Sequence, residues 1–300
     1  MARRMTDKAR RRRNIQGYAF ALPYLLLFAA FTILPVLISM FFGLTRFNML
    51  QPPKFVGLDN YIKLFLEDEI FPIAFKNTLI YAAITGPISY VLCFFFAWCL
   101  NELNPKVRAL MTFMLYSPSI SGNAYLIWTL ILSGDSYGYL NGILLKLGVI
   151  YEPVQWFQDP QYIVPFVLLI ILWMSLGTSF LVFIAGFQGI DAALCEAAAV
   201  DGVRNRWQEL WYVTLPSMKP QLLFSAVMSI TSAFSVGDVV TGLAGFPSTD
   251  YAAHTLMLHL QDYGGMRFEM GYASAIATLL FGIMMLCNLL FNKALRRVGR

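Results

Sequence analysis

The chain has 300 residues, of which 58% are hydrophobic and 13% charged, and its mean hydropathy is +0.61. These values exclude a soluble globular domain of useful size, because such domains carry about twice this proportion of charged residues. We therefore expect a polytopic membrane protein.

Six apolar runs are long enough to cross the hydrocarbon core of a bilayer as helices, which takes roughly 20 residues. They cover residues 18–44, 73–100, 109–132, 161–187, 220–241 and 271–292. The predicted fold class is therefore all-α, with six transmembrane helices. Pro23 and Pro35 predict kinks in the first run, and Pro118 and Gly122 predict kinks in the third.

A basic segment, residues 1–17, precedes the first run and carries Arg3, Arg4, Lys8 and Arg10 to Arg13. A cleavable signal peptide would have a shorter apolar core and a small-residue cleavage site. We therefore expect the run 18–44 to be retained as a span, with its basic end in the cytoplasm. A basic patch for nucleic acid is the weaker interpretation, and no nucleic-acid partner is expected.

The distribution of charge predicts which segments lie on which side of the membrane. With both termini in the cytoplasm, the inner segments 1–17, 101–108, 188–219 and 293–300 hold most of the 22 lysines and arginines, as the positive-inside rule requires. The outer segments are then 45–72, 133–160 and 242–270. Within them, Leu140 to Val149 is apolar enough to form a short helix at the interface. The last outer segment is expected to touch an external partner, although a plain connecting loop fits nearly as well.

One long segment, residues 188–219, is neither an apolar span nor a short polar connector. Leu194 to Val200 is rich in helix-forming residues, Gly202 suits a left-handed helix end, and Arg206 to Val213 resumes helical character. The segment is predicted to be a bent pair of short helices, after which Pro216 sets the start of the next span.

The amino-acid sequence of this segment resembles that of a known protein family. Glu196-Ala197-Ala198, Asp201-Gly202 and Leu215-Pro216, in this order, resemble the cytoplasmic coupling loop of permease subunits in ATP-binding-cassette (ABC) importers, most closely those that import sugars and oligosaccharides. The resemblance covers roughly residues 15 to 297. It implies a five-helix permease core over residues 73–292, with the coupling loop at 188–219, in a bacterial or archaeal cytoplasmic membrane.

The resemblance also implies partners and a set of coupling residues. The partners would be a second permease subunit, with a heterodimer expected, two ATP-binding subunits and an extracellular or periplasmic solute-binding protein. ATP and Mg would bind the partner ATPase, since this chain has no G-x-x-x-x-G-K-[ST] phosphate loop and no cofactor of its own is expected. The residues expected to contact the ATPase are Glu196, Ala197, Ala198, Asp201, Gly202, Arg204, Arg206, Leu215 and Pro216.

These coupling residues suit a helix that docks in a groove on another protein. The alanines and the glycine allow close backbone approach, and the glutamate would accept a charge-assisted hydrogen bond or hold the shape of the loop. The two arginines would pair with acidic residues of the ATPase, although a solvated, positive face on the cytoplasmic side explains them equally well.

Polar side chains within the spans point to a path for substrate, because such groups are costly in lipid. On the fifth span, Gln221 and three serines fall within a sector of about 80°. The candidate path residues on the third, fourth and fifth spans are Asn123, Tyr125, Trp128, Trp173, Thr178, Ser179, Ser225, Ser229, Ser232 and Asp238. Their hydroxyls, amides and aromatic faces suit a neutral polyol. Three alternatives stay open: serines that join helices, tryptophans that anchor at the interface and an aspartate that caps a helix end.

Other function classes are less favoured. No nucleophile–base arrangement, metal-ligand set or pair of intramembrane carboxylates supports an enzyme, and His254 and His259 are expected to be solvated external residues. The four cysteines imply no disulfide framework. Six-span carriers built from three repeats would show Pro-x-Asp/Glu-x-x-Lys/Arg in each repeat, and no such period is found. An importer of another polar solute with the same architecture, or an unrelated six-helix secondary transporter, remains the alternative.

Overall fold

The computed structural model describes the backbone of residues 7–295 and the side chains of residues 17–293. The expectations for residues 1–6 and 296–300, including those for Arg3 and Arg4, lie outside the described residues. Nearly all regular structure is helical, as the all-α prediction requires. One short antiparallel ladder joins β1 (Thr45–Arg46) to β2 (Lys54–Phe55).

Five helices within the described residues are long and apolar enough to cross a membrane. They cover Gly17–Phe42, Phe71–Asn101, Pro160–Gln188, Lys219–Ala244 and Met270–Lys293. They match five of the six predicted runs. The third run, 109–132, instead forms two shorter helices, α5 (Pro105–Ile120) and α6 (Leu126–Ile131). Gly122, with a φ of +64°, lies between them. Because neither of these two helices is among the five long ones, the predicted number of six spans stays a prediction.

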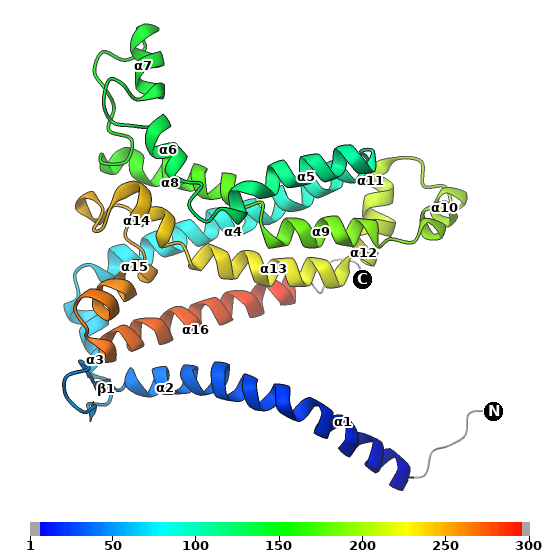
Figure 1. Ribbon diagram of the computed structural model, residues 1–300, viewed down its shortest axis with the longest axis horizontal. Coiled ribbons are helices and arrows are strands. Elements are labelled where there is room, and N and C mark those ends of the chain that lie inside the picture. Colours follow the sequence, from blue (N-terminus) through cyan, green and yellow to red (C-terminus); the bar gives the residue numbers. More distant parts are fainter. Residues whose placement is uncertain (1–6, 296–300) are drawn as a thin grey trace.

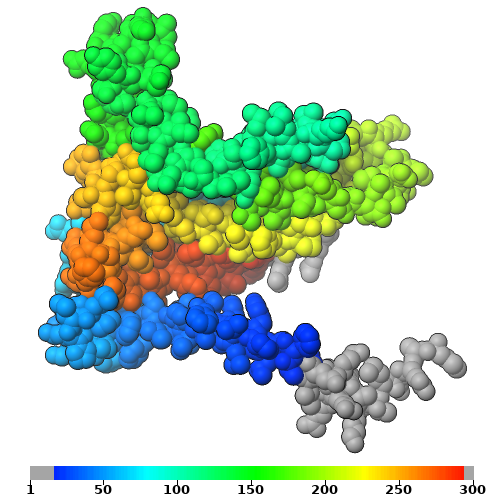
Figure 2. Space-filling view, in the orientation of Figure 1, coloured from blue at the N-terminus to red at the C-terminus, as the bar shows by residue number. Residues whose placement is uncertain are grey.

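The first span combines α1 (Asp7–Phe28) and α2 (Leu34–Phe42), with a π-helical turn, Ala29–Ile33, between them. The turn lies between Pro23 and Pro35, where the sequence predicts a bend. All side chains in the apolar stretch of this span are described, and none is buried. In Figure 2 the dark-blue part of this span, which begins at Gly17, lies apart from the helices above it. An apolar helix this exposed requires lipid or another subunit around it.

Two of the remaining spans are broken partway along. α8 (Pro160–Met174) and α9 (Thr178–Gln188) are separated at residues 175–177, and α13 (Lys219–Phe234) and α14 (Asp238–Ala244) are separated at residues 235–237. Both breaks contain a serine and a glycine, which favour local departures from helix geometry. The long helices α4 (Phe71–Asn101) and α16 (Met270–Leu295) run uninterrupted beside them (Figure 1).

The core is built around α4, which packs against α9 and α13. In one half of the bundle, Cys93 of α4 and Phe180 and Phe183 of α9 are fully buried. In the other half, Leu256 and Ile276 are fully buried in a second cluster that includes the start of α16. This apolar packing fixes the relative positions of the helices whose polar residues form the site.

The two ends of the bundle carry different structures, which we call the α15 end and the α10 end. At the α15 end lie α3 (Asp59–Ile62) with a π-helical turn at Lys63–Glu67, a short 3-10 helix at Thr249–Tyr251, α15 (Leu256–Gln261) and a second π-helical turn at Asp262–Met266. α7 (Tyr139–Lys146) projects sideways from this end (Figure 1). A helix within Leu140–Val149 is therefore confirmed, and its contact with the membrane interface stays a prediction.

The projecting segment around α7 is held together by one buried amide, Asn141, which has no exposed surface. Its Nδ2 donates to the carbonyl oxygens of Ser133 and Val154, at 3.0 Å each, and its Oδ1 accepts from Trp156 Nε1 at 3.1 Å. Because these bonds satisfy the amide from both sides of the helix, the segment is a defined structure and not a loose loop.

At the opposite end lie α10 (Ala192–Val200), α11 (Arg206–Glu209), a π-helical turn at Leu210–Thr214 and α12 (Leu215–Ser217). This arrangement confirms the predicted pair of short helices. The start of α1 and the end of α16 lie at the same end of the bundle as α10 (Figure 1).

Candidate functional site

Both ends of α10 are closed by local hydrogen bonds. At its start, the Asp191 carboxylate accepts a backbone N–H of the first turn at 3.0 Å. At its end, Gly202 has a φ of +97° and donates its N–H to the carbonyl of Ala199 at 3.2 Å, while the N–H of Val203 donates to that of Ala198 at 3.0 Å. This pair of bonds is a Schellman motif, and it confirms the predicted left-handed helix end at Gly202.

α10 buries nothing against the rest of the chain. All nine of its residues are described, and none is buried. Leu194 is 50% exposed and Val200 is 88% exposed, and Glu196 and Ala197 are also exposed. A helix with defined ends, exposed apolar side chains and a small-residue surface has the properties of a segment that docks on another protein.

The helix that follows anchors this segment to the bundle. The ring of Trp207 lies 5.0 Å from that of Trp98 on α4, measured between centroids. Arg206 forms two ion pairs, from its Nε to Glu102 Oε1 at 3.2 Å and from its Nη1 to Glu209 Oε2 at 3.0 Å. The structure therefore pairs Arg206 within the chain, where the sequence alone left the choice between a partner's acids and solvent.

The other predicted coupling residues lie around this anchor. Asp201 is the last residue before the left-handed turn, and the exposed Arg204 uses its backbone N–H to donate to Gln208 Oε1 at 2.8 Å. Leu215 is half-buried and Pro216 exposed, both in α12. They lead into α13, and their contact with the ATPase stays a prediction.

A second feature is a cavity of about 340 Å³ where the polypeptide leaves helical geometry between α5 and α6, between α8 and α9, and between α13 and α14. Its lining is rich in hydroxyl groups and includes one acidic side chain. The polar residues that line it are Thr85, Ser89, Ser119, Ser175, Thr178, Ser179, Ser229, Ser232, Ser235 and Asp238. We call this space the hydroxyl cavity. It brings together five of the predicted path residues.

The serine stripe on α13 divides into two groups. Ser225 has no exposed surface, and its carbonyl accepts a hydrogen bond from Ser179 Oγ at 3.3 Å. Ser229 Oγ lies 3.3 Å from the same Ser179 Oγ. Ser225 therefore joins α9 to α13, whereas Ser179 and Ser229 both join the helices and line the cavity. Ser232 and Asp238 are exposed and line the cavity.

Besides Ser225, four predicted path residues do not line the hydroxyl cavity: Asn123, Tyr125, Trp128 and Trp173. Tyr125 is buried and donates its hydroxyl to Asn123 Oδ1 at 3.4 Å. The rings of Trp128 and Trp173 meet edge to face at 5.6 Å between centroids. Tyr125 belongs to the apolar cluster around α8 and Trp128 packs against it, whereas Trp173 is 37% exposed. Their role in stacking on a sugar stays a prediction.

The sequence reasoning missed several cavity residues. Thr85 and Ser89 are four residues apart on α4, a spacing that places them on one helix face and could have flagged them. Ser119 and the break at residues 175–177 meet because Gly177 has no side chain. A Cβ there would lie 2.7 Å from Ser119 Oγ, so the glycine permits the close approach.

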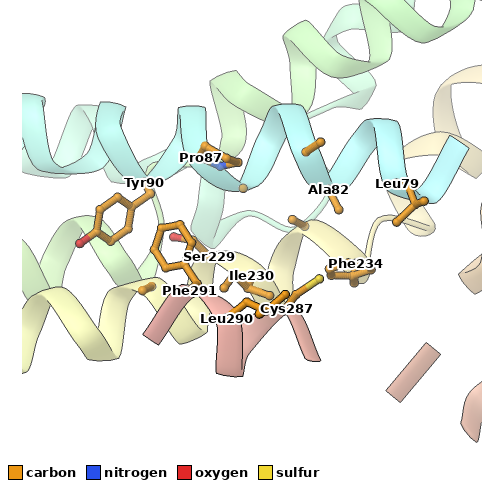
Figure 3. A pocket seen from close by; sticks show the side chains of 14 residues that line it. Leu79, Ala82, Pro87, Tyr90, Ser229, Ile230, Phe234, Cys287, Leu290 and Phe291 are labelled. Atoms are coloured by element: carbon orange, nitrogen blue, oxygen red, sulfur yellow. The ribbon is translucent and has the colours of Figure 1, made fainter. Parts of the chain in front are cut away.

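On another face of α13 lies an apolar groove of about 410 Å³ between α4, α13 and α16. Leu79, Ile230, Phe234 and Phe291 contribute to its walls (Figure 3). Ser229 lines both the groove and the hydroxyl cavity. α13 thus separates an apolar face, which carries Ile230, from a face that carries hydroxyls.

A buried polar cluster at the α15 end was also missed. Asp68 Oδ2 accepts hydrogen bonds from His259 Nε2 at 2.9 Å and Tyr272 OH at 2.6 Å, while Oδ1 accepts the backbone N–H of Ile70 at 2.9 Å. His254 Nε2 lies 3.3 Å from His259 Nδ1. Both histidines are 1% exposed, so the expectation of solvated external histidines was wrong.

The cluster perturbs its titratable groups. Burial works to raise the pKa of the Asp68 carboxyl, but the hydrogen bonds from His259 and Tyr272 and the charge of His259 hold that pKa well below its usual range. Burial, together with the neighbouring His259, lowers the pKa of His254 to about 4. The cluster ties the segment before α4 to α15 and α16 through one carboxylate.

The sequence was compared with known proteins. No family model matches it. It is 32% identical to a probable ABC transporter permease protein of Bacillus subtilis, over 94% of this chain and 91% of that protein. It is 30% identical to a lactose transport system permease protein of Rhizobium radiobacter, over 97% of this chain and 96% of that protein. Among solved structures, a bacterial ABC transporter that imports the acidic polysaccharide alginate matches with a TM-score of 0.76 and 25% identity, over 96% of this chain and 98% of that chain.

Proposed function

The chain belongs to the permease proteins of ABC transporters, and we propose that it passes a sugar or oligosaccharide across the membrane through the hydroxyl cavity. It is a multi-pass protein of the cell membrane. The import direction and the sugar both follow the resemblance of its coupling loop. They agree with the lactose system named for one relative and the alginate importer named for the solved structure.

The observation that carries the proposal is the hydroxyl cavity itself. A sugar that leaves water needs a partner for each hydroxyl, since an unpaired buried hydroxyl costs about 1–3 kcal/mol. Hydroxyl side chains such as Ser232 and Thr178 both donate and accept, so they match sugar hydroxyls in either role. The volume of about 340 Å³ also falls in the range of small-molecule sites.

The energy for transport is proposed to arrive through α10. In this proposal ATP and Mg bind a partner ATPase subunit, and α10 sits in a groove on that subunit and moves with it. The exposed Glu196 and Ala197 and the half-buried Ala198 would form the contact. The Schellman turn at Gly202 keeps the docking helix a fixed unit, and Trp207 transmits its movement to α4 through Trp98.

A second permease subunit is proposed to cover the open side of the cavity, with a heterodimer expected. Ser232, Ser235 and Asp238 are exposed in this chain, and an exposed carboxylate on a membrane helix requires water or a polar partner. The exposed first span offers a further surface for such a partner or for lipid. The solute-binding protein is proposed to deliver its sugar at the α15 end.

Both termini are proposed to lie in the cytoplasm. The α10 end must face the ATPase, and the start of α1 and the end of α16 lie at that end (Figure 1). The α15 end then faces outward, in agreement with the positive-inside rule.

The test is reconstitution of the chain with its partner permease, ATPase and binding protein in proteoliposomes, followed by ATP-dependent uptake of a panel of radiolabelled mono- and oligosaccharides. We expect uptake of at least one sugar, and about tenfold loss or more when both Ser232 and Thr178 are replaced by valine. The matched control is Val227→Thr on the same helix. Uptake of an amino acid or another solute that is not a sugar, with no sugar transported, would contradict the proposal.

A further inference from the structure

We propose, resting on the sugar path assigned above, that Asp238 makes this path selective against acidic sugars, so that its substrate is an uncharged oligosaccharide.

The charge distribution of the hydroxyl cavity carries this inference. All residues that line the cavity lie in the described part of the chain, and among them Asp238 alone bears a formal charge. Its carboxylate is exposed, and among the side chains that the structure describes, residues 17–293, it has no ion-pair partner. Its negative potential is therefore not cancelled locally.

The hydroxyl groups alone would not discriminate between neutral and acidic sugars. A serine hydroxyl donates to the carboxylate of a uronic acid as readily as to the hydroxyl of a neutral sugar. A fixed carboxylate at the same surface repels the first and hydrogen-bonds the second. Repulsive groups placed against an unwanted ligand are a general source of specificity.

A purely structural role for Asp238 must be distinguished from this one. Asp238 lies in the first turn of α14, where an acidic side chain stabilises the helix through its dipole, although Gly237 occupies the capping position. An asparagine at position 238 preserves most of the shape and hydrogen bonding, whereas it removes the charge. The measurement must therefore respond to the charge at position 238 and not to the stability of α14.

The experiment uses the complete transporter, with the four native cysteines of this chain replaced and a single cysteine at Ser232→Cys. The rates of its modification by a cationic and an anionic methanethiosulfonate of similar size are compared with and without Asp238→Asn. Two unit charges about 6 Å apart in water attract or repel enough to change each rate roughly threefold. We expect the cation-to-anion rate ratio to fall about fivefold to tenfold in the Asp238→Asn variant.

Two controls accompany the measurement. Asp238→Glu keeps the charge and should keep the ratio, and Asp250→Asn removes an exposed carboxylate that does not line the cavity and should leave the ratio unchanged. A ratio that Asp238→Asn leaves within twofold of its starting value would overturn the proposal, and so would an equal fall in Asp250→Asn.

A transport measurement completes the test. For the neutral sugar that the panel shows to be taken up fastest, the corresponding uronate is assayed in the same proteoliposomes. The uronate should enter at least tenfold more slowly, and Asp238→Asn should narrow this gap severalfold. If no sugar is taken up but the cation-to-anion ratio still falls in Asp238→Asn, the proposed sugar path is wrong, whereas the negative potential at Asp238 is confirmed. If neutral sugar and uronate enter equally well, only the selectivity is wrong.

Discussion

The two ends of the bundle place their polar residues in opposite ways. At the α15 end, the Asp68 carboxylate is 5% exposed and is bonded to His259, Tyr272 and the backbone at the start of α4. At the α10 end, Arg206 is 63% exposed and its partner Glu102 is 45% exposed, while α10 beside them buries none of its nine described residues.

This difference indicates which end is complete within the chain. The α15 end satisfies its charges internally, so it behaves as part of the folded core. The α10 end leaves helix surface and charge open, as the proposed docking of an ATPase subunit requires. Substitutions at the first end should therefore affect stability, and substitutions at the second should affect coupling.

The largest effect on stability is expected at Asp68. Asp68→Ala leaves His259 and Tyr272 buried without their acceptor and removes the bonds to the start of α4. A buried polar group left without its hydrogen-bond partner costs about 1–3 kcal/mol, so we expect a clearly lower unfolding temperature for the purified chain in detergent. Glu69→Gln, on the exposed neighbouring residue, is the control. An unfolding temperature equal to that of Glu69→Gln would show that the cluster does not hold this end together.

The pH dependence of the α15 end is the next largest effect. Folding lowers the pKa of His254 to about 4 from an ordinary value of 6.5, so the unfolded chain binds more protons between these two values. Stability should therefore fall as the pH drops from about 6.5 to 4, by about 3 kcal/mol in total. The contribution of Asp68 has the same sign but is lost only below about pH 4. Unfolding of His254→Gln should show a flatter pH profile over this range. An unchanged profile would rule out His254 as the titrating group.

At the α10 end, Gly202→Val should impair coupling to ATP hydrolysis while leaving the stability of the bundle unchanged. A β-branched residue at a φ of +97° adds backbone strain of about 1–3 kcal/mol and opens the Schellman turn. Because this turn is exposed, we expect an unfolding temperature of the bundle close to wild type. Sugar-stimulated ATP hydrolysis by the reconstituted complex should fall at least tenfold. Gly202→Asn, which tolerates positive φ better, should retain most of it. Full stimulation in Gly202→Val would show that α10 is not the coupling helix.

The smallest stability effect is expected at Arg206. Its ion pairs with Glu102 and Glu209 are exposed, and such pairs contribute about 0–1 kcal/mol. Arg206→Gln should therefore leave the unfolding temperature nearly unchanged, with ATP hydrolysis reduced no more than in Arg204→Gln. If Arg206→Gln alone abolished the stimulation of ATP hydrolysis, Arg206 would pair with the ATPase in the complex instead of pairing with Glu102.

The local features of this molecule were predictable from sequence. The helix end at Gly202 depends on one glycine after a run of alanines, and the polar face at Ser225, Ser229 and Ser232 depends on helical spacing within one span. These signals need only neighbouring residues. The prediction of which residues line the cavity is weaker where a helix is interrupted. The chain leaves helical geometry after Phe234, and Ser235 and Asp238 therefore line the same cavity as Ser232, which the spacing of a continuous helix does not predict.

Contacts between distant segments were not predictable in this way. Asp68 and His259 are separated by 191 residues and meet only because α15 folds back over the start of α4. The same limit applies to the edge-to-face contact of Trp128 and Trp173, which come from different helices. A single sequence carries no signal for such pairings, so the buried cluster and the true cavity lining required the structure.

If α10 passes the movement of the ATPase to the bundle, as proposed, it should control access to the hydroxyl cavity. The most direct measurement is the rate at which a membrane-impermeant thiol reagent modifies Ser232→Cys from outside, in the reconstituted complex, with and without Mg-ATP. We expect Mg-ATP to change this rate at least threefold when position 202 is glycine, and to leave it unchanged in Gly202→Val. A rate that is insensitive to Mg-ATP with Gly202 in place, or equally sensitive in both, would contradict the claim.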